Sequence, residues 1–301
     1  MNQQKYSGAL KILTLMVCFG IMGAFGLNLI DKYQQIQQFK QANHLLAQKK
    51  YTTAITAYDR LLADNLAKPH LVWINRGYAF LGINKYQDML QSCSNATLIA
   101  PEVGMGWNCK GEALYYLEEY AEALEAFELA TTKDSSEATF WLNKAKVLSH
   151  FQQYEAAVTA NQQAIKLIPT SQLDRASQQR YLAIAFNQKG QNLLRTNQYQ
   201  EALNAFEQSL KNSPDSLLAQ QGKGIALYEL GKYQQAIAIF VPILQRNNLT
   251  KEQQAMSWLY TGMSYCLAQQ VDAATSAFKK VLQLTKNTQF KAIAKKGCGV
   301  R

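Results

Sequence analysis

The sequence predicts an all-α protein, a solenoid of about seven helix pairs preceded by one transmembrane helix. The composition favours helices, because Ala, Leu, Gln, Lys and Glu are frequent and only 5 prolines and 16 glycines occur among 301 residues. A pattern of small and aromatic residues recurs at a nearly regular spacing along most of the chain. An uncharged apolar segment near the N-terminus accounts for the membrane helix.

The apolar segment runs from Ile12 to Ile30 and carries no charge. About 20 apolar residues in a helix cross the ~30 Å hydrocarbon layer of a bilayer. A cleaved signal peptide has a shorter apolar core and an A-x-A-like site, and no such site follows here. We therefore expect a short tail at 1–11 and an uncleaved signal-anchor helix at 12–30. A cleaved signal and a buried soluble helix are the alternatives.

The charges that flank this segment bear on its orientation. Lys5 and Lys11 precede it with the amino terminus, whereas Asp31 and Lys32 follow it and nearly balance. Positive charge is retained on the cytoplasmic side of a membrane helix. We therefore expect the repeats on the extracytoplasmic side. The charge difference is small, because further lysines follow the segment.

The repeated unit has two halves. In the first half a glycine or alanine occupies one position, and in most units a tryptophan or phenylalanine precedes it by four residues. In the second half a tyrosine is followed after three residues by a small residue, and four residues later by an aromatic one in most units. The tyrosines are Tyr51, Tyr86, Tyr120, Tyr154, Tyr199 and Tyr233, and the small residues of the first half are Ala42, Gly77, Gly111, Ala145, Gly190, Gly224 and Gly262.

This unit resembles the tetratricopeptide repeat, which reads W-x2-L-G-x2-Y, then A-x3-F, then P. Trp107, Gly111, Ala123 and Phe127 match that pattern in the third unit. Units starting near residues 35, 70, 104, 138, 183, 217 and 255 fit it. The resemblance implies a right-handed superhelical solenoid of helix pairs. In such arrays the first helix of each unit lines a concave face that commonly holds a peptide or a partner's helix.

An insertion after Pro169 lengthens the spacing between the fourth and fifth units. We expect a longer first helix there, capped by Ser171 or Asp174. The array then divides into repeats 1–4 at 35–172 and the extension with repeats 5–7 at 173–286. The basic residues 287–301 are expected to form a capping helix and tail.

Two units depart from the pattern, since Cys93 and Asn161 stand where an aromatic residue is expected. We expect their helices to pack less regularly. Cys93 and Cys109 lie on neighbouring predicted helices. They form a disulfide if their Cα atoms approach within about 7 Å, and two buried thiols are the alternative.

Helical phasing predicts which residues of the first helices face the partner. Aromatic rings would stack on the partner, and amides would bond to its backbone. The alternative is that the tyrosines only pack between units. Gln221 is expected on the same face, where the acids Glu112 and Glu229 stand apart. The predicted groove residues are Tyr78, Asn108, Glu112, Tyr115, Tyr116, Lys146, Asn187, Gln191, Arg195 and Tyr228.

Several function classes are not expected. The net charge of +10 comes largely from the C-terminal end, which we interpret as a solvated surface, and no nucleic-acid-binding motif accompanies it. The 5 cysteines and 3 histidines have no metal-ligand spacing. No nucleophile, base and phosphate-loop arrangement occurs, so we expect no catalytic residues, no cofactor, no small-molecule substrate and no enzyme.

The sequence therefore predicts a membrane-anchored scaffold or adaptor that binds a protein or peptide partner in its concave groove. One alternative is a structural or assembly subunit of a membrane complex that uses its convex face and basic tail. Another is an exported soluble protein with a cleaved signal.

Overall fold

The computed structural model describes residues 32–63 and 68–299, and these consist of helices, turns and loops without a strand. The predicted anchor at 12–30 lies outside the described residues. Within the described ranges, no helix combines the length and the apolar character needed to span a bilayer.

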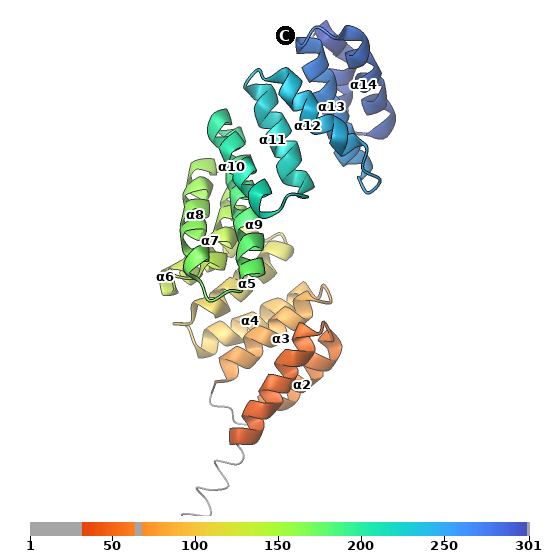
Figure 1. Cartoon of the computed structure of the whole chain (residues 1–301). Coiled ribbons are helices and arrows are strands. Elements are labelled where there is room, and N and C mark those ends of the chain that lie inside the picture. The colour runs from red at the N-terminus through yellow and green to blue at the C-terminus, as the bar shows by residue number, and fades with distance from the viewer. Residues whose placement is uncertain (1–31, 64–67, 300–301) are drawn as a thin grey trace, which may run out of the picture. The chain divides into compact units, whose positions relative to one another are not determined.

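The chain divides into two compact units, the first ending at Lys133 and the second beginning at Asp134. Unit 1 contains three helix pairs, and consecutive helices pack side by side (Figure 1). Its helices cover residues 32–47, α2 (Tyr51–Ala63), α3 (Pro69–Leu81), α4 (Tyr86–Ile99), α5 (Gly104–Tyr116) and α6 (Tyr120–Lys133).

Unit 2 contains four pairs and a short terminal helix, again with consecutive helices in contact. The predicted division at residues 172–173 stays a sequence-based prediction. The elements are α7 (Ala138–His150), α8 (Tyr154–Leu167), the 3-10 turn η1 (Ile168–Thr170), α9 (Arg175–Arg195), α10 (Tyr199–Asn212), α11 (Leu217–Glu229), α12 (Tyr233–Leu244), α13 (Lys251–Leu267), α14 (Val271–Leu284), α15 (Thr288–Lys296) and the 3-10 turn η2 (Gly297–Gly299).

The glycines of the first helices lie against the aromatic rings of the second helices. A Cβ atom added at Gly111 would lie 2.7 Å from the ring of Phe127, and one at Gly190 would lie 2.8 Å from the ring of Phe206. These separations are too short for van der Waals contact, so a side chain there would push the helices apart. The glycines therefore mark a close contact between the two helices of a pair, and Gly224 with Phe240 and Gly262 with Phe278 repeat it.

Asn161 occupies the aromatic position of α8 and is fully buried. Its amide nitrogen donates to Oε1 of Gln188 at 2.9 Å, and its Oδ1 accepts from Asn192 at 3.3 Å. A buried amide is stable when its polar atoms have partners. A polar network therefore replaces the ring in this pair.

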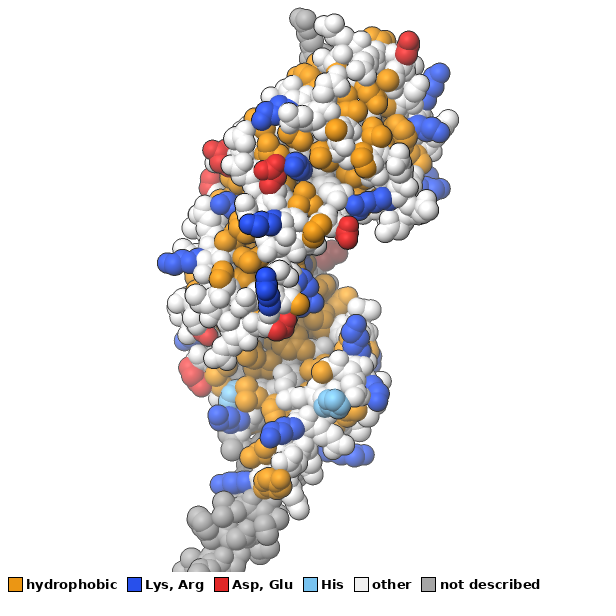
Figure 2. Space-filling view, viewed as in Figure 1, with side chains coloured by type: hydrophobic (Ala, Val, Ile, Leu, Met, Phe, Trp, Pro, Cys, Tyr) orange, Lys and Arg blue, Asp and Glu red, His pale blue; other side chains and the backbone are white. Residues whose placement is uncertain are grey.

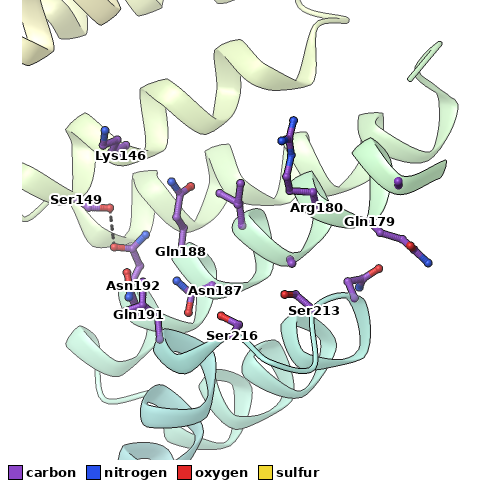
Figure 3. Close-up of a pocket in the computed structure, with 15 residues that line it drawn as sticks. Lys146, Ser149, Gln179, Arg180, Asn187, Gln188, Gln191, Asn192, Ser213 and Ser216 are labelled. Carbon is purple, nitrogen blue, oxygen red and sulfur yellow. Dashed lines mark hydrogen bonds between the residues drawn. The ribbon is translucent and has the colours of Figure 1, made fainter. Parts of the chain in front are cut away.

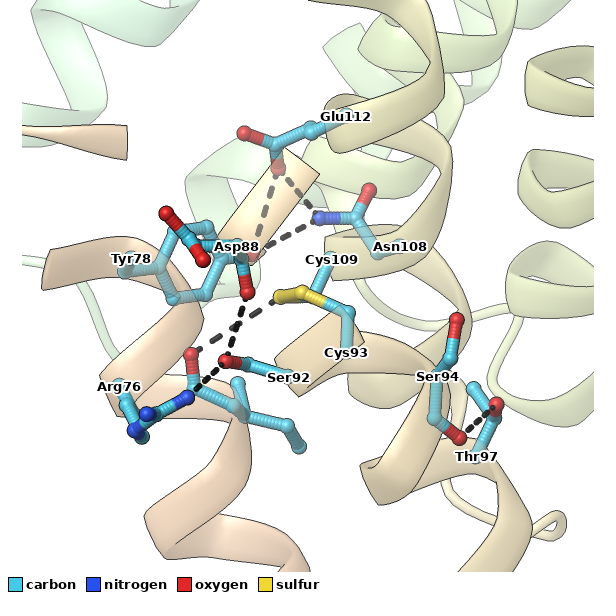
Figure 4. Close-up of a disulfide and its surroundings, with 11 residues drawn as sticks. Arg76, Tyr78, Asp88, Ser92, Cys93, Ser94, Thr97, Asn108, Cys109 and Glu112 are labelled. Carbon is cyan, nitrogen blue, oxygen red and sulfur yellow. Dashed lines mark hydrogen bonds between the residues drawn. A yellow bond between two sulfur atoms is a disulfide. The ribbon is translucent and has the colours of Figure 1, made fainter. Parts of the chain in front are cut away.

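Cys93 takes the other irregular aromatic position and forms a disulfide with Cys109, their Cα atoms lying 5.5 Å apart (Figure 4). Both sulfur atoms face Gly77, where an added Cβ would lie 2.7 Å from Sγ of Cys93 and 3.0 Å from Sγ of Cys109. The disulfide thus fills the space that a ring fills in other pairs. Of the two alternatives that the sequence left open, the structure shows the bonded one.

The inserted segment and the C-terminal end form the predicted helices. Asp174 caps α9, and its Oδ1 accepts from the backbone N–H of Ser177 at 3.0 Å. Hydrogen bonds from the side chain and the backbone of Ser177 to the Asp174 carboxylate lower its pKa. At the other end, Cys298 in η2 is bonded to Cys266 in α13, with Cα atoms 5.2 Å apart. This second disulfide, which the sequence did not predict, fastens α15 to the last repeat.

Candidate functional site

Unit 2 carries a groove on its first helices. It consists of two hollows of about 650 and 800 Å³ that share Ser149, Gln191, Asn192 and Leu218 among their lining residues. The first hollow lies along α7, α9 and the start of α11, and the second continues over α11 and α13 to α15. We call this continuous surface the unit 2 groove.

Amide side chains from α9 line the first hollow, with Lys146 of α7 nearby and Ser213 and Ser216 on the loop before α11 (Figure 3). Part of this row is fixed by hydrogen bonds. Oγ of Ser149 donates to Oδ1 of Asn192 at 2.7 Å, and Asn192 continues into the buried Asn161 network. These bonds fix the orientation of the Asn192 side chain at the base of the groove.

Two amide oxygens in the groove are buried and have no hydrogen-bond donor among the described residues, Oδ1 of Asn187 and Oε1 of Gln221. Gln221 is 2% exposed, and its Nε2 donates to the carbonyl oxygen of Gln253 at 3.1 Å and to Oγ of Ser257 at 2.9 Å. These bonds fix its orientation and leave Oε1 without a donor. An unpaired buried acceptor costs about 1–3 kcal/mol, so such atoms are uncommon in folded proteins.

The two orphan acceptors occupy the same position in consecutive repeats, since Gln221 follows Asn187 by one repeat length. The same spacing relates Ile184 and Leu218, whose side chains line the groove while 40% and 54% exposed. The groove thus repeats one motif on α9 and α11, an exposed aliphatic side chain followed after three residues by an amide acceptor.

Charged side chains line both hollows of the groove. Lys146 and Arg180 line the first hollow, and Arg195 and Glu229 line the second. Burial raises the pKa of the Glu229 carboxyl. Burial also raises the pKa of the Tyr260 hydroxyl. The negative charge of Glu229 raises this pKa further, and the positive charge of Arg195 lowers it. The pKa of Tyr260, on α13, therefore depends on both charges.

In unit 1, three predicted groove residues contact one another. Nδ2 of Asn108 donates to Oε1 of Glu112 at 2.6 Å and lies 3.1 Å from the hydroxyl oxygen of Tyr78, which itself donates to Glu112 at 3.3 Å (Figure 4). Asn108 is 3% exposed. The amide at this repeat position is therefore held by side chains of its own unit.

The two remaining predicted residues of unit 1 belong to an aromatic cluster. Tyr115 meets Tyr116 and Tyr120 edge to face, and Tyr116 stacks on Tyr86 at a centroid distance of 5.0 Å. Burial is the main cause that raises the pKa of Tyr115 and of Tyr116. These contacts favour the packing alternative, and a role in partner binding stays a prediction.

Four predicted residues line the unit 2 groove, namely Lys146, Asn187, Gln191 and Arg195. Tyr228 does not line either hollow and instead packs edge to face on Tyr260. Sequence reasoning missed most of the other lining residues, five of which enter the arguments below. The repeat spacing from Ile184 points to Leu218, whereas Arg180, Tyr260 and Phe290 depend on the extension of α9 and on how α13 and α15 pack. These five residues are Arg180, Ile184, Leu218, Tyr260 and Phe290.

Stacked helix pairs with a peptide-sized groove define a class of helical-repeat proteins that are typically non-catalytic protein-interaction scaffolds. The sequence profile of the tetratricopeptide repeat matches residues 39–93, 110–171, 187–247 and 222–287. The chain therefore belongs to the tetratricopeptide repeat family.

Solved structures share this fold. The tetratricopeptide protein YrrB, described as having an unusual peptide-binding site, is 17% identical over 69% of this chain and 99% of its own, with a TM-score of 0.54. PilF of Pseudomonas aeruginosa is 17% identical over 75% and 97%, with a TM-score of 0.61. The apo form of RapI is 14% identical over 87% and 80%, with a TM-score of 0.65. No curated protein matches the chain.

Proposed function

We propose that this protein is a membrane-anchored scaffold whose unit 2 groove binds an extended peptide segment of a partner protein. The observation that carries the proposal is the pair of buried amide oxygens, on Asn187 and Gln221, that lack donors among the described residues. An extended peptide presents backbone N–H groups that supply such donors.

The spacing of the two acceptors suits an extended chain. Repeat-equivalent atoms on successive first helices are separated by on the order of 10 Å, the packing distance of helices. A strand advances about 3.3 Å per residue, so N–H groups some three residues apart reach both amides. The exposed side chains of Ile184 and Leu218 then cover apolar side chains of the same segment. The peptide-binding site named for YrrB supports this use of the fold.

The membrane part of the proposal rests on the sequence. The uncharged segment at residues 12–30 is long enough for a membrane anchor. The disulfides Cys93–Cys109 and Cys266–Cys298 support placing the repeats on the extracytoplasmic side, because disulfides persist in oxidising compartments. A cleaved signal would lead to the same compartment without the anchor.

Site-specific photo-crosslinking in intact cells tests the groove. We would replace Ile184 or Leu218, the exposed aliphatic side chains that line the groove beside the two amides, by a photoreactive phenylalanine in the full chain and illuminate the cells. A partner should be captured from both positions, because both side chains lie in the groove. The control is Gln208, an exposed side chain on the second helix α10. Equal capture from Gln208, or capture from neither groove position, would refute a groove-dependent partner.

A second candidate, an assembly subunit, is favoured by the surface of the C-terminal end. On the face that Figure 2 shows, apolar side chains gather over α12 to α14 with basic side chains among them. Five lysines of α14, α15 and the loop between them are exposed, namely Lys279, Lys280, Lys286, Lys295 and Lys296. Changing these lysines to glutamine should release the protein from its complex if this surface assembles, whereas Asn187→Ala should not.

A further inference from the structure

We propose that the second hollow of the unit 2 groove selects a peptide segment with side chains of opposite charge, an acidic one facing Arg195 and a basic one facing Glu229. This inference rests on the proposed peptide-binding function and specifies the chemistry of its partner.

The two charges hold equivalent positions. Arg195 is the last residue of α9 and Glu229 the last residue of α11, and one repeat length separates them. Of the described residues that line the second hollow, these two carry the charges. The rest of the lining is uncharged and mixes apolar and aromatic side chains, such as Leu218, Ile225 and Tyr260, with amides. Opposite charges at neighbouring repeat positions therefore stand in an otherwise uncharged surface.

Neither charge is neutralised inside the described part of the chain, where Arg195 and Glu229 take part in no ion pair or side-chain hydrogen bond. One repeat along a solenoid corresponds to on the order of 10 Å, beyond the ~4 Å reach of a direct ion pair. The Tyr260 ring lies within electrostatic influence of both groups. Partial burial already removes water from Glu229 and raises the pKa of its carboxyl. A cation placed beside it would offset that loss of hydration.

The separation of the charges sets the spacing in the ligand. An extended peptide covers on the order of 10 Å in about three residues, so the acid and the base should lie two to four residues apart. Apolar side chains between them would contact Leu218, Ile225 and Tyr260. At the far end, α15 contributes Phe290 to the lining, and the Cys266–Cys298 disulfide holds that wall in place.

Selection from a random dodecapeptide display library tests the inference on the purified full chain. Peptides that bind the native chain should be enriched for an acid and a base two to four residues apart. The variant that exchanges both charges, Arg195→Glu with Glu229→Arg, should enrich the reverse order of the two charges. Reversing only one of the two charges should lower the affinity for the best peptide selected on the native chain about three- to tenfold. That loss of affinity should be smaller at high salt.

The selection separates two failures. One outcome is that peptides bind and lose affinity on Gln221→Met, yet show no charge pattern and no response to the charge exchange. This outcome would overturn the charge-pair inference and leave the proposed peptide groove standing. Failure to enrich any peptide whose binding depends on Asn187 or Gln221 would overturn the groove itself. Because Arg195 and Glu229 are exposed, their variants should still unfold in one cooperative transition without a large loss of stability, which confirms that the fold is intact.

Discussion

The amide at one repeat position has different surroundings in the two units. In unit 1, the amide nitrogen of Asn108 donates to Glu112 and lies within hydrogen-bond distance of the Tyr78 hydroxyl. In unit 2, the equivalent Asn187 and Gln221 each keep an oxygen without a donor among the described residues. The acceptor Glu112 is replaced at its repeat position by Gln191 and Ile225 in unit 2. The two oxygens therefore have unused hydrogen-bonding capacity.

Glu229 gives a prediction on stability. Burial raises its pKa in the folded chain, so the folded state binds a proton more readily than the unfolded state. The ionised Glu229 carboxylate therefore lowers the free energy of unfolding. This loss is absent at pH values below the pKa of Glu229 in the unfolded chain, and it is complete once the pH has risen through its pKa in the folded chain. Glu229→Gln should be more stable than the native chain at pH 7, and the difference should vanish toward pH 4. Urea unfolding midpoints at the two pH values measure this.

The control for Glu229 is Glu207, whose Oε1 lies 3.0 Å from Nζ of Lys223. An exposed ion pair contributes little to stability, and its loss should not stabilise the protein. Glu207→Gln is therefore expected to leave the midpoint unchanged or slightly lower at pH 7. A gain of the same size in both variants would contradict a specific cost at Glu229 and indicate a general effect of net charge.

At the scale of the helix, Phe206 shows how one side chain holds neighbouring helices together. Its ring lies against both Gly190 of α9 and Gly222 of α11, so one side chain of α10 fills the space between two first helices. The ring is fully buried and belongs to the core cluster of unit 2. Stability of each pair therefore depends on the next pair, as expected for a solenoid.

Replacing Gly190 by alanine tests this contact. The new Cβ would lie 2.8 Å from the Phe206 ring, and such overpacking costs about 1–3 kcal/mol. We expect a lower midpoint in thermal or urea unfolding, with part of the loss recovered by the additional change Phe206→Leu.

Gly106 in α5 is the matched control. A Cβ there would meet Thr97 at 3.4 Å, an ordinary contact. Gly106→Ala should be neutral or stabilise the helix by up to about 1 kcal/mol, because alanine has the higher helix propensity. An equal loss in Gly106→Ala and Gly190→Ala would show that the Phe206 contact is not the cause.

At the scale of the whole molecule, each unit carries its own disulfide. Cys266 and Cys298 close a segment with a sequence separation of 32 that contains α14 and α15. Closing such a loop stabilises the folded state by roughly 3–4 kcal/mol in the chain-entropy model. With 9 residues, α15 is too short to be stable alone, so the disulfide and packing of Ala294 hold it.

Reduction should therefore loosen α15 before the central repeats. Hydrogen exchange of the α15 amides is expected to quicken in Cys298→Ser and in the native chain with reductant, while α9 to α11 keep their protection. Thiol labelling of the denatured, unreduced native chain should leave Cys93, Cys109, Cys266 and Cys298 unmodified. Labelling of these four residues would show that the bonds are absent and would remove the support for an oxidising compartment.

Much of the fold was predictable because it depends on local periodicity. The small and aromatic positions recur once in each repeat, and each marks where one helix crosses the next. The turn between the helices of a pair was less visible. It requires a left-handed residue, and glycine fills this place only at Gly231 among the described turns of this kind, whereas Asn84, Asn197 and others adopt a positive φ despite their side chains.

The sequence by itself determined the helix pairs, the glycine–aromatic contacts and the long capped helix α9, since residues close along the chain or one repeat apart produce them. The tertiary structure alone decided which amides face a groove without a donor, and that Cys266 meets Cys298. Those facts depend on side-chain orientation and on contacts between helices, and the periodicity of the sequence does not specify how those helices pack. Asn108 and Asn187 hold the same repeat position, yet Nδ2 of Asn108 bonds to Glu112, whereas Oδ1 of Asn187 is buried without a donor among the described residues.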